Sequence, residues 1–456
     1  MHGFLVFCLA TAIAEAPTAA PPAVTSARQL SLSQALVNAD EHQPQIRQAA
    51  ANTLAARARV MESRGPLLPQ VQGTAALIGT NYFGGNNGSS IGVGVGGSAT
   101  GVGAGAGPGS SGGGAYLNSA GGWRTTLGLT ASELLWDFGQ TWNRARSFQA
   151  SADQFQLTEE ELRVVTHQAV RAAYYNAHAL RALLGVAQDT LENQRKHVQQ
   201  TEAQIRVGTQ PEIALATARA TFFSDSYQLI QAQGSYSTGK AQLNQAMGVE
   251  GSLDYDVNDH DAPLVPGEDA STEDLLAEAL KARPAYRAME RQVDAQSLLV
   301  SSYKGSYWPQ LSAEGGVFAT ATRPTNLAGD VFGELVLNWT LFNGLTNVGN
   351  VREQKANLLA LEAQRDELRQ QIRLDLETAR LAVLTAKSGL ESTAQAVLNA
   401  HEQLRLAEGR FAAGVGNIIE LSDAQLTYTA AEVQQVQAEY NLNNARATLL
   451  AKLGQG

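Results

Sequence analysis

The chain has 456 residues, of which 44% are hydrophobic and 17% are charged, and this balance predicts a folded protein and excludes wholesale disorder. Its net charge of -10 gives no clustered Lys and Arg for neutralising phosphates, so we expect no nucleic-acid partner. The acidic balance otherwise indicates solubility only.

The N-terminus begins with a short apolar run that ends in small residues, and Ala12-Ile13-Ala14 offers an A-x-A cleavage site. We therefore predict a secretory signal peptide at residues 1–14 and an Ala/Pro-rich segment at 15–28. No Lys or Arg precedes the apolar run, which leaves open a true start upstream of Met1. The single cysteine, Cys8, lacks the position and neighbours of a lipidation site, so we expect no N-terminal acyl anchor.

The rest of the chain contains an internal duplication. Seven positions between Ser31 and Gln70 recur 240 residues later without a gap. From Leu135 onward the offset is 206, and in this comparison Arg206 is paired with Arg410, Gly208 with Gly414 and Gly248 with Gly454. We predict a first repeat at 29–248, an acidic linker at 249–270 and a second repeat at 271–456.

The change of offset places an insert in the first repeat, at residues 84–122. This segment holds 17 of the 43 glycines and almost no charge, which predicts a mobile loop without a core. Its run Gly92-Val93-Gly94-Val95-Gly96-Gly97 formally matches a dinucleotide-binding fingerprint. We reject that match because no helix follows to receive the phosphate.

Long helices are expected where proline is absent and Ala, Leu, Gln, Glu and Arg dominate. Residues 140–207 and 346–413 could each form a helix about 100 Å long. Apolar residues at seven-residue spacing predict a coiled-coil seam on each; they are Leu184, Leu191, Val198 and Ile205 in the first repeat, and Leu390, Val397, Leu404 and Phe411 in the second. A glycine turn follows each long helix, so we predict returning helices at 212–247 and 418–453. Further helices are expected at 31–64 and 271–304.

Each repeat also contains two runs of alternating apolar and polar residues, which predict strands at 71–83 and 123–136 and at 310–321 and 331–342. No stretch after the signal reaches the roughly 18 to 20 apolar residues of a transmembrane helix, so any membrane crossing is expected from strands. A half-buried soluble sheet would show a similar alternation. Aromatic placement favours the membrane, because four tryptophans at or near strand ends are typical of interfacial girdles; they are Trp123, Trp136, Trp308 and Trp339.

Four strands cannot close a membrane barrel, since about eight is the practical minimum and an open edge in lipid leaves backbone groups unpaired. The subunit must therefore oligomerise. Twelve strands from three chains would enclose a lumen too wide for side chains to fill, which predicts a pore. The expected fold class is a membrane α+β protein.

The duplicated plan resembles the outer membrane efflux protein (TolC-like) family over essentially the whole mature chain. The motifs that carry the resemblance are Pro69-Gln70 and Pro309-Gln310 before the strands, Leu135-Trp136-Asp137 and Leu341-Phe342-Asn343-Gly344 after them, and the paired glycine turns. Each motif alone is weak, and their order and repetition make the resemblance strong.

The resemblance implies a homotrimer with a 12-stranded barrel in outer-membrane lipid and a long α-helical barrel of coiled-coil hairpins through the periplasm. The Gly-rich insert would then face outside. Members conduct substrates passively from an inner-membrane pump and a periplasmic adaptor (membrane fusion protein), in efflux or type I secretion. The cargo and the class of pump stay open.

The resemblance also assigns candidate sites at the helical tips. Val207-Gly208-Thr209 looks like the family's adaptor-docking tip, and Gly414-Val415-Gly416 stands at the second tip but departs from that pattern. Glu420 and Asp423 match the acidic positions that ring the closed entrance, and six carboxylates from three subunits would attract cations. The alternative is a solvated helix face.

No catalytic arrangement emerges, and the seven histidines lack metal-ligand spacing, so we expect no enzyme activity, no cofactor and no metal site. The acidic residues of the linker lack the pattern of an EF-hand. The main competing interpretation is a structural or adhesive surface protein with a coiled-coil stalk and a barrel anchor, which would gather its strands at one end of the chain. A periplasmic adaptor would instead show a lipoyl-like half-motif on either side of one hairpin.

Overall fold

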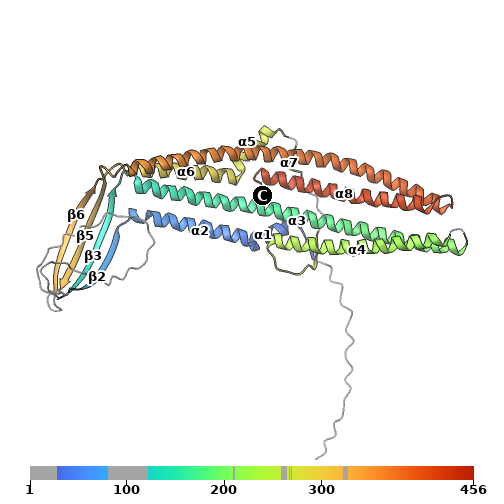
Figure 1. The fold of residues 1–456 in the computed structure, drawn as a ribbon, viewed down its shortest axis with the longest axis horizontal. Coiled ribbons are helices and arrows are strands. Elements are labelled where there is room, and N and C mark those ends of the chain that lie inside the picture. The colour runs from blue at the N-terminus through green and yellow to red at the C-terminus, as the bar shows by residue number, and fades with distance from the viewer. Residues whose placement is uncertain are drawn as a thin grey trace, which may run out of the picture.

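The computed structural model describes residues 28–80, 122–208, 211–257, 264–266, 268, 270–321 and 327–455. These residues form a long helical rod, with a sheet at one end and the tips of two helical hairpins at the other (Figure 1). The predicted signal peptide and all of the Gly-rich insert except Gly122 lie outside the described residues. Within the described part of the chain, no helix has both the length and the apolar character needed to cross a membrane.

The two repeats have the same order of elements, which confirms the predicted duplication. The first repeat contains β1 (Arg28–Leu30), α1 (Leu32–His42), α2 (Pro44–Arg64), the short 3-10 helix η1 (Gly65–Leu67), β2 (Gln70–Thr80), β3 (Gly122–Trp136), α3 (Gln140–Arg206) and α4 (Glu212–Met247). After β4 (Tyr255–Val257), the second contains α5 (Thr272–Ala282), α6 (Pro284–Gly305), β5 (Gln310–Ala321), β6 (Leu327–Asn338), α7 (Thr346–Ala412) and α8 (Ile418–Lys452).

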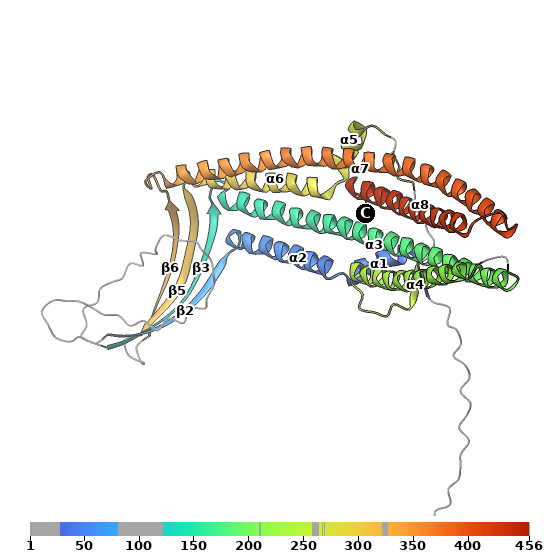
Figure 2. The same cartoon turned by 45° about the vertical axis from the view of Figure 1, so that its right-hand side comes forward.

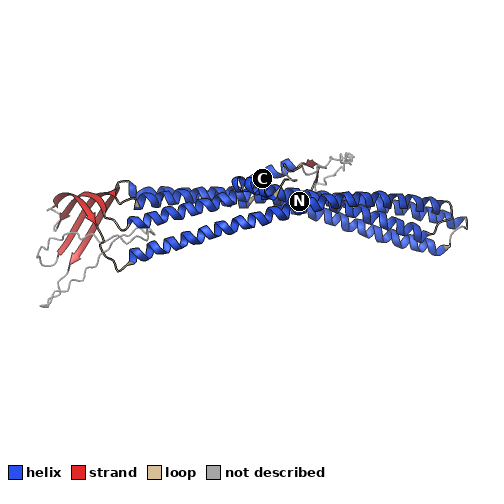
Figure 3. Cartoon of the chain, turned by 90° about the horizontal axis from the view of Figure 1, so that it is seen from above, coloured by secondary structure: helices blue, strands red, loops and turns tan. Residues whose placement is uncertain are grey.

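Some predicted boundaries were wrong. The helices expected at 31–64 and 271–304 are each divided in two, because Pro44 and Pro284 hold the preceding residue in an extended conformation. These residues are Gln43 and Arg283, with ψ of 118° and 117°. The strand expected at 331–342 instead spans 327–338. The last residue of the Ala/Pro-rich segment expected at 15–28 is the first residue of β1, which pairs in parallel with β4 beside the middle of the rod (Figure 3).

The four long strands form one antiparallel sheet in the order β2-β3-β5-β6. Because side chains alternate between the faces of a strand, the register sorts them into two sets. One face holds almost only apolar residues, among them Val71, Leu77, Leu127, Leu129, Val317, Val331, Leu335 and Leu337. The other is mostly polar, with Gln72, Thr74, Thr130, Ser132, Glu314, Asp330 and Glu334. Among the described strands, β2 and β6 each have one edge without a paired neighbour.

The helices form one curved layer in which α3 and α7 run the whole length of the rod (Figures 1 and 2). In the half nearer the sheet the order is α2, α3, α6, α7, and in the far half it is α4, α3, α8, α7. The pairs α2/α4 and α6/α8 therefore lie end to end. The layer consists of two helical hairpins, as the seven-residue seams predict.

Two clusters of buried side chains lie where the shorter helices meet end to end. The first joins α1, α3 and α4 through residues that include Val170, Tyr174 and Leu243, and the second joins α5, α7 and α8 through Ile372, Leu376 and Leu449 among others. These clusters hold the middle of the rod together through apolar burial.

The recurring glycines at the ends of α4 and α8 have a specific role here. Gly248 and Gly454 adopt left-handed φ angles of 70° and 78°. A Cβ at either position would lie 2.7 Å from the Cα of Gln43 or Arg283, the residues at the two helix breaks. Only glycine combines this conformation with so close an approach of two backbones.

Asp137 and its counterpart Asn343 have the same role in the turns between strand and helix. Asp137 is buried, and its carboxylate accepts the backbone N–H groups of Gly139 (3.1 Å) and Thr141 (2.6 Å) at the start of α3. Asn343 uses its amide oxygen in the same way toward the N–H of Asn347 (3.4 Å) at the start of α7. Both side chains satisfy N–H groups that have no partner inside the helix.

Candidate functional site

The two hairpin turns lie together at the end of the rod farthest from the sheet (Figure 1). Gly208 and Gly414 follow α3 and α7 with left-handed φ angles of 78° and 71°, as is usual where a helix ends. Their neighbours Val207 and Val415 are 74% and 73% exposed. Each tip thus presents an apolar side chain to its surroundings. Thr209 lies outside the described residues.

The second tip is further constrained by Gly416. The N–H groups of Val415 and Gly416 both donate to the carbonyl of Arg410, at 3.1 and 2.9 Å. A Cβ on Gly416 would lie 2.8 Å from the backbone nitrogen of Phe411. This close fold-back is the physical reason for the second glycine, which the first tip lacks.

The structure corrects one pairing between the repeats. Because α3 and α7 are both 67 residues long and Gly208 matches Gly414, the offset of 206 holds to the tips. The counterpart of Arg410 is therefore Gln204, and the pairing of Arg206 with Arg410 was wrong by two residues. Arg410 is a feature of the second tip alone.

The predicted gate residues occupy the first turns of α8. Asn417 caps this helix by accepting the N–H of Ile419 (3.2 Å). The carboxylate of Glu420 lies 3.2 Å from the guanidinium of Arg410 across the turn, with both side chains about half exposed. Asp423 is exposed and has no ion-pair partner among the described residues. The two acidic side chains are therefore electrostatically unequal, which their spacing did not reveal.

The seam between α7 and α8 fixes how these residues are presented. Leu404, Ala407 and Phe411 pack against Leu421 and Ala424, which are all buried. Leu404 and Phe411 are two of the residues that the seven-residue pattern assigned to a seam. Because Leu421 and Ala424 face α7, the residues between them, including Asp423, turn away from that helix.

The contact between the two hairpins, where α3 meets α8, is more polar. Near the tips it encloses a cavity of about 10 Å³ lined by residues that include Gln194, His197, Ser422 and Gln425, room for roughly one water molecule. Burial lowers the pKa of His197, and the charge of Glu408 offsets this lowering only in part. Farther along, the hydroxyl groups of Thr190 and Thr429 are 3.4 Å apart.

The polar face of the sheet combines carboxylates with an aromatic pair. Glu314 lies opposite Glu334, and Asp330 lies opposite Phe318. The rings of Phe318 and Phe332 stack with centroids 5.4 Å apart. A Cβ on Gly128 or Gly316 would collide with one of these rings, so the glycines make room for the stack. On the apolar face of the described strands, the charged residue is Glu133, near the helical end of β3.

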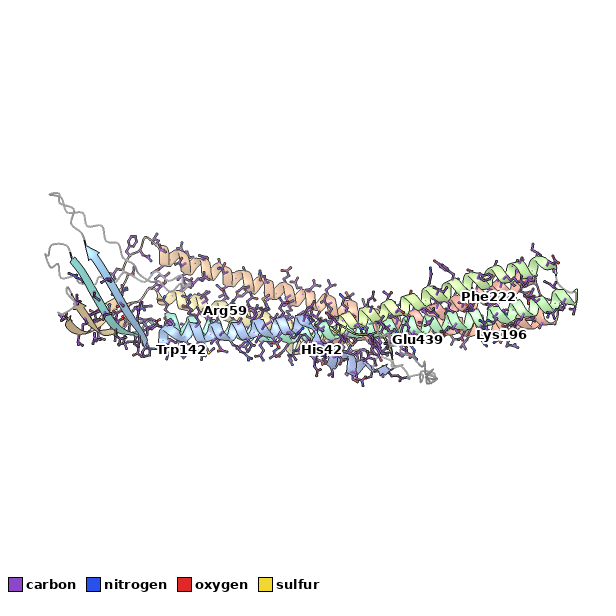
Figure 4. The ribbon with its side chains drawn as sticks, turned by 90° about the horizontal axis from the view of Figure 1, so that it is seen from below. His42, Arg59, Trp142, Lys196, Phe222 and Glu439 are labelled. Atoms are coloured by element: carbon purple, nitrogen blue, oxygen red, sulfur yellow. The ribbon has the colours of Figure 1, made fainter. Side chains whose placement is uncertain are left out.

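Aromatic residues gather where the sheet joins the rod. Trp136, Trp308 and Trp339 lie at the ends of β3, β5 and β6 nearest the helices, and all are more than half exposed. Trp123 is the second residue of β3, at the opposite end of the sheet, and its side chain lies outside the described set. The sequence interpretation missed Trp142, which is 58% exposed in the first turn of α3 beside the sheet (Figure 4).

No group of three or more His, Cys, Asp or Glu side chains in the described residues is placed to hold a metal ion. The acidic linker instead contributes a buried structural carboxylate. Glu268 accepts hydrogen bonds from Arg446 (3.2 Å) and lies 2.6 Å from the ammonium of Lys387. Burial alone would raise the pKa of Glu268, but these two cations outweigh burial and hold its pKa below the usual range.

These features define the class of protein. An antiparallel sheet with one apolar and one polar face suits a wall between lipid and water, and its two open edges require further strands to close it. The helical rod extends that wall far beyond a membrane, and its tips carry acidic side chains. This is the architecture of an outer-membrane exit channel.

Comparison with known proteins identifies the family. The sequence profile of the family described as "Outer membrane efflux protein" matches residues 35–249 and 275–455, and the chain belongs to this family. The outer membrane efflux protein BepC of Brucella suis is 25% identical over 350 residues, covering 72% of each chain. The protein CyaE of Bordetella pertussis is 23% identical over 335 residues, covering 72% of this chain and 70% of that one.

Among solved structures, CusC superimposes with a TM-score of 0.78 at 17% identity and covers 93% of this chain and 92% of its own. The protein is therefore an outer-membrane channel of efflux or secretion systems, with the TolC-like fold, and it extends into the periplasm. Channels of this family are trimeric transporters rather than enzymes, and they work in tripartite systems. Family membership decides against the adhesive stalk.

Proposed function

We propose that three copies of this chain form the exit duct of a tripartite pump and conduct substrates passively from a periplasmic adaptor and inner-membrane pump to the exterior. The observation that carries the proposal is the sheet, whose apolar face suits lipid and whose polar face suits a water-filled lumen. Three such sheets joined edge to edge give twelve strands and leave no open edge.

The adaptor would dock at the helical tips. Val207 and Val415 are among the most exposed apolar residues that the structure describes, and each is next to a glycine with a left-handed φ angle. A partner that covers them would gain free energy from burying apolar surface. The membrane-interface role of Trp136, Trp308 and Trp339 is part of the same proposal, since it places the sheet in lipid and the tips toward the pump. Trp123 would serve the opposite interface.

The entrance gate would rest mainly on Asp423. Three subunits would place three Asp423 carboxylates around a narrow bore, where like charges attract cations. Glu420 belongs to the same ring but contributes less, because Arg410 compensates its charge at 3.2 Å. The exposed carboxylate of Asp423 at the second tip supports this arrangement. In the first repeat, the counterparts of Glu420 and Asp423 are the uncharged residues Ala214 and Thr217.

Conductance in planar bilayers tests the gate. We expect Asp423→Asn to weaken block by multivalent cations about fivefold or more, since each charge near a bore is worth on the order of 1 kcal/mol and a trimer loses three. Glu420→Gln should have a smaller effect, and Arg410→Gln should strengthen the block because it exposes the charge of Glu420. Glu402→Gln is the control, since Glu402 is paired with Arg405 on an exposed part of α7. Equal block in all four variants would reject the gate assignment.

A further inference from the structure

The internal repeat provides a precedent for contacts between subunits. Within the chain, α3 has a neighbour on each side, with α2 and α6 in one half of the rod and α4 and α8 in the other. Helix α7 is the counterpart of α3, yet among the described elements its long-helix neighbours, α6 and α8, lie on one side only. Helices α2 and α4 likewise have one free side. The layer therefore has two free edges, one on α7 and one on α2 and α4. The equivalent faces, on α3 and on α6 and α8, contact each other inside the chain.

We propose that α7 packs on α2 and α4 of the next copy of this chain in the register in which α3 packs on α6 and α8, and that Glu367 caps α2 of the neighbouring subunit across this interface. A neighbouring copy of this chain therefore covers the free face of α7, and another covers the free faces of α2 and α4. The inference rests on the trimer of the proposed function and adds the residues that align it.

The cap follows from a contact inside the chain. Glu161 on α3 accepts the backbone N–H of Ala285 (3.1 Å), the second residue of α6. Glutamate recurs 206 positions later, as Glu367 on α7, which is exposed and has no hydrogen-bond partner among the described residues. The counterpart of Ala285 is Gln45, the second residue of α2.

The first turn of α2 has no side-chain cap among the described residues. It contains no acidic residue, and the residue before it makes no capping hydrogen bond through its side chain. Its N–H groups therefore need an acceptor from elsewhere. In the proposed register a carboxylate stands opposite these donors, near the positive end of the helix dipole, as Glu161 does at α6. The N–H donors of α2 and the carboxylate acceptor of Glu367 thus lie on the two faces that would meet.

Glycines give a second, independent match. A Cβ on Gly305, at the end of α6, would lie 2.8 Å from the Cβ of Gln140 at the start of α3, so this glycine permits close packing. Its counterpart Gly65 has nothing within 4 Å of the same position in the single chain. The proposed register places Gly65 against Thr346, the counterpart of Gln140, in the partner subunit. Gly65 would then contact the partner subunit as closely as Gly305 contacts Gln140 within the chain.

The far half of the rod fits the same register. Thr190 on α3 meets Thr429 on α8, and their counterparts are Ala396 on α7 and Phe223 on α4. Phe223 is 69% exposed, in the half of the rod toward the tips, where Figure 4 labels its neighbour Phe222. One heptad farther along, Ile230, 62% exposed, would face Gly389, which has open space. Large residues on α4 would meet small ones on α7, as packed helices require.

Trimer dissociation tests the cap. We expect Glu367→Ala to speed the dissociation of detergent-solubilised trimers into monomers about fivefold or more, since a lost helix cap typically changes an equilibrium by that factor. The helical circular dichroism of the monomer should not change. Glu391→Ala is the matched control, because Gly185, the counterpart of Glu391, has nothing within 4 Å and so faces away from the neighbouring helices. Equal dissociation rates for the two variants would overturn the cap.

Cysteine cross-linking tests the register separately. The chain has one cysteine, Cys8, inside the predicted signal peptide. The hydroxyl of Ser147 donates to the carbonyl of Ala295 at 2.7 Å, and the counterparts of these residues are Glu353 and Ala55. Ser147→Cys with Ala295→Cys should form a bridge within one chain. Ala55→Cys with Glu353→Cys should form disulfide-linked dimers and trimers.

The outcomes separate the two proposals. Linked trimers from the second cysteine pair, visible on non-reducing gels, would support the register. Trimers that form by native mass but are never linked by that pair would overturn the register and leave the exit duct intact. A chain that stays monomeric in the outer membrane would overturn the duct and this interface together.

Discussion

At the scale of single residues, the glycines of this chain differ in their structural roles, although the sequence alone does not distinguish them. Gly208 and Gly414 end helices in open space, whereas Gly248 and Gly454 lie against the backbone of another helix break. Gly185 lies within α3, and a Cβ there would have no described atom within 4 Å. The cost of adding a methyl group therefore depends on the surroundings of each glycine.

Gly454→Ala is expected to destabilise the fold by about 2 kcal/mol or more. A left-handed conformation costs a non-glycine residue roughly 1–2 kcal/mol, and the new Cβ would also lie 2.7 Å from the Cα of Arg283. Gly185→Ala should instead stabilise by about 0.5–1 kcal/mol, because alanine is the better helix former. Urea unfolding followed by circular dichroism measures both changes. Equal effects of the two substitutions would contradict the assigned role of Gly454.

Turn chemistry was enough to predict the glycines of the tips, but it did not predict the partner of Glu420. The distance between Glu420 and Arg410 depends on how the chain folds back between them, and pairing Arg410 with Arg206 concealed that Arg410 is unique to the second tip. Trp142 was missed for a different reason. The girdle pattern applies to strand ends, whereas Trp142 belongs to the first turn of α3.

At the scale of elements, the alternation of apolar residues and the absence of proline predicted the strands and the long helices. The helix breaks at Pro44 and Pro284 were not predicted. Apolar periodicity continues across Pro44 and Pro284, and proline is well tolerated in the first turn of a helix, so each pair of helices looked like one. The acidic composition of residues 249–270 likewise predicted only a linker between the repeats. Glu268 is nevertheless 5% exposed, since its partners come from α7 and α8, far away in sequence.

Glu268→Gln should destabilise the contact of the linker with α7 and α8 by roughly 2–3 kcal/mol near pH 7, because two cations lose their counter-charge. The pKa of Glu268 is lowered in the folded state, so its stabilisation is complete above the ordinary carboxyl value of 4.5 and is lost as the pH falls through the folded value. Unfolding of the wild type and the variant should therefore converge in acid. A difference that stays constant between pH 7 and pH 3 would contradict this role.

At the scale of the whole molecule, the duplication made the fold predictable. Motifs that are weak alone, such as Leu135-Trp136-Asp137, occur twice at a fixed spacing, and four strands demand closure by other subunits. Sequence periodicity could not establish which strands are neighbours. The order β2-β3-β5-β6 joins the repeats through β3 and β5, and this pairing leaves β2 and β6 as the edges through which subunits would join.

The orientation of the sheet can be tested with two adjacent residues of β3. Leu129 lies on the apolar face between Gly73 and Val317, whereas Thr130 lies on the polar face between Gln72 and Gly316. Leu129→Arg would place a charge in lipid, which costs about 2–4 kcal/mol near the bilayer midplane, so folding into lipid vesicles should fail or slow severely. Thr130→Arg should insert normally, because its charge would meet water in the lumen.

The same pair also reports on conduction. Thr130→Arg adds three positive charges to the lumen of a trimer, near a face that carries Glu314, Asp330 and Glu334, and it should shift the reversal potential away from cation preference. Gel mobility of the folded protein measures insertion, and a salt gradient across a planar bilayer measures selectivity. Insertion of Leu129→Arg together with failure of Thr130→Arg would mean that the polar face meets lipid, which would reject the assigned lumen.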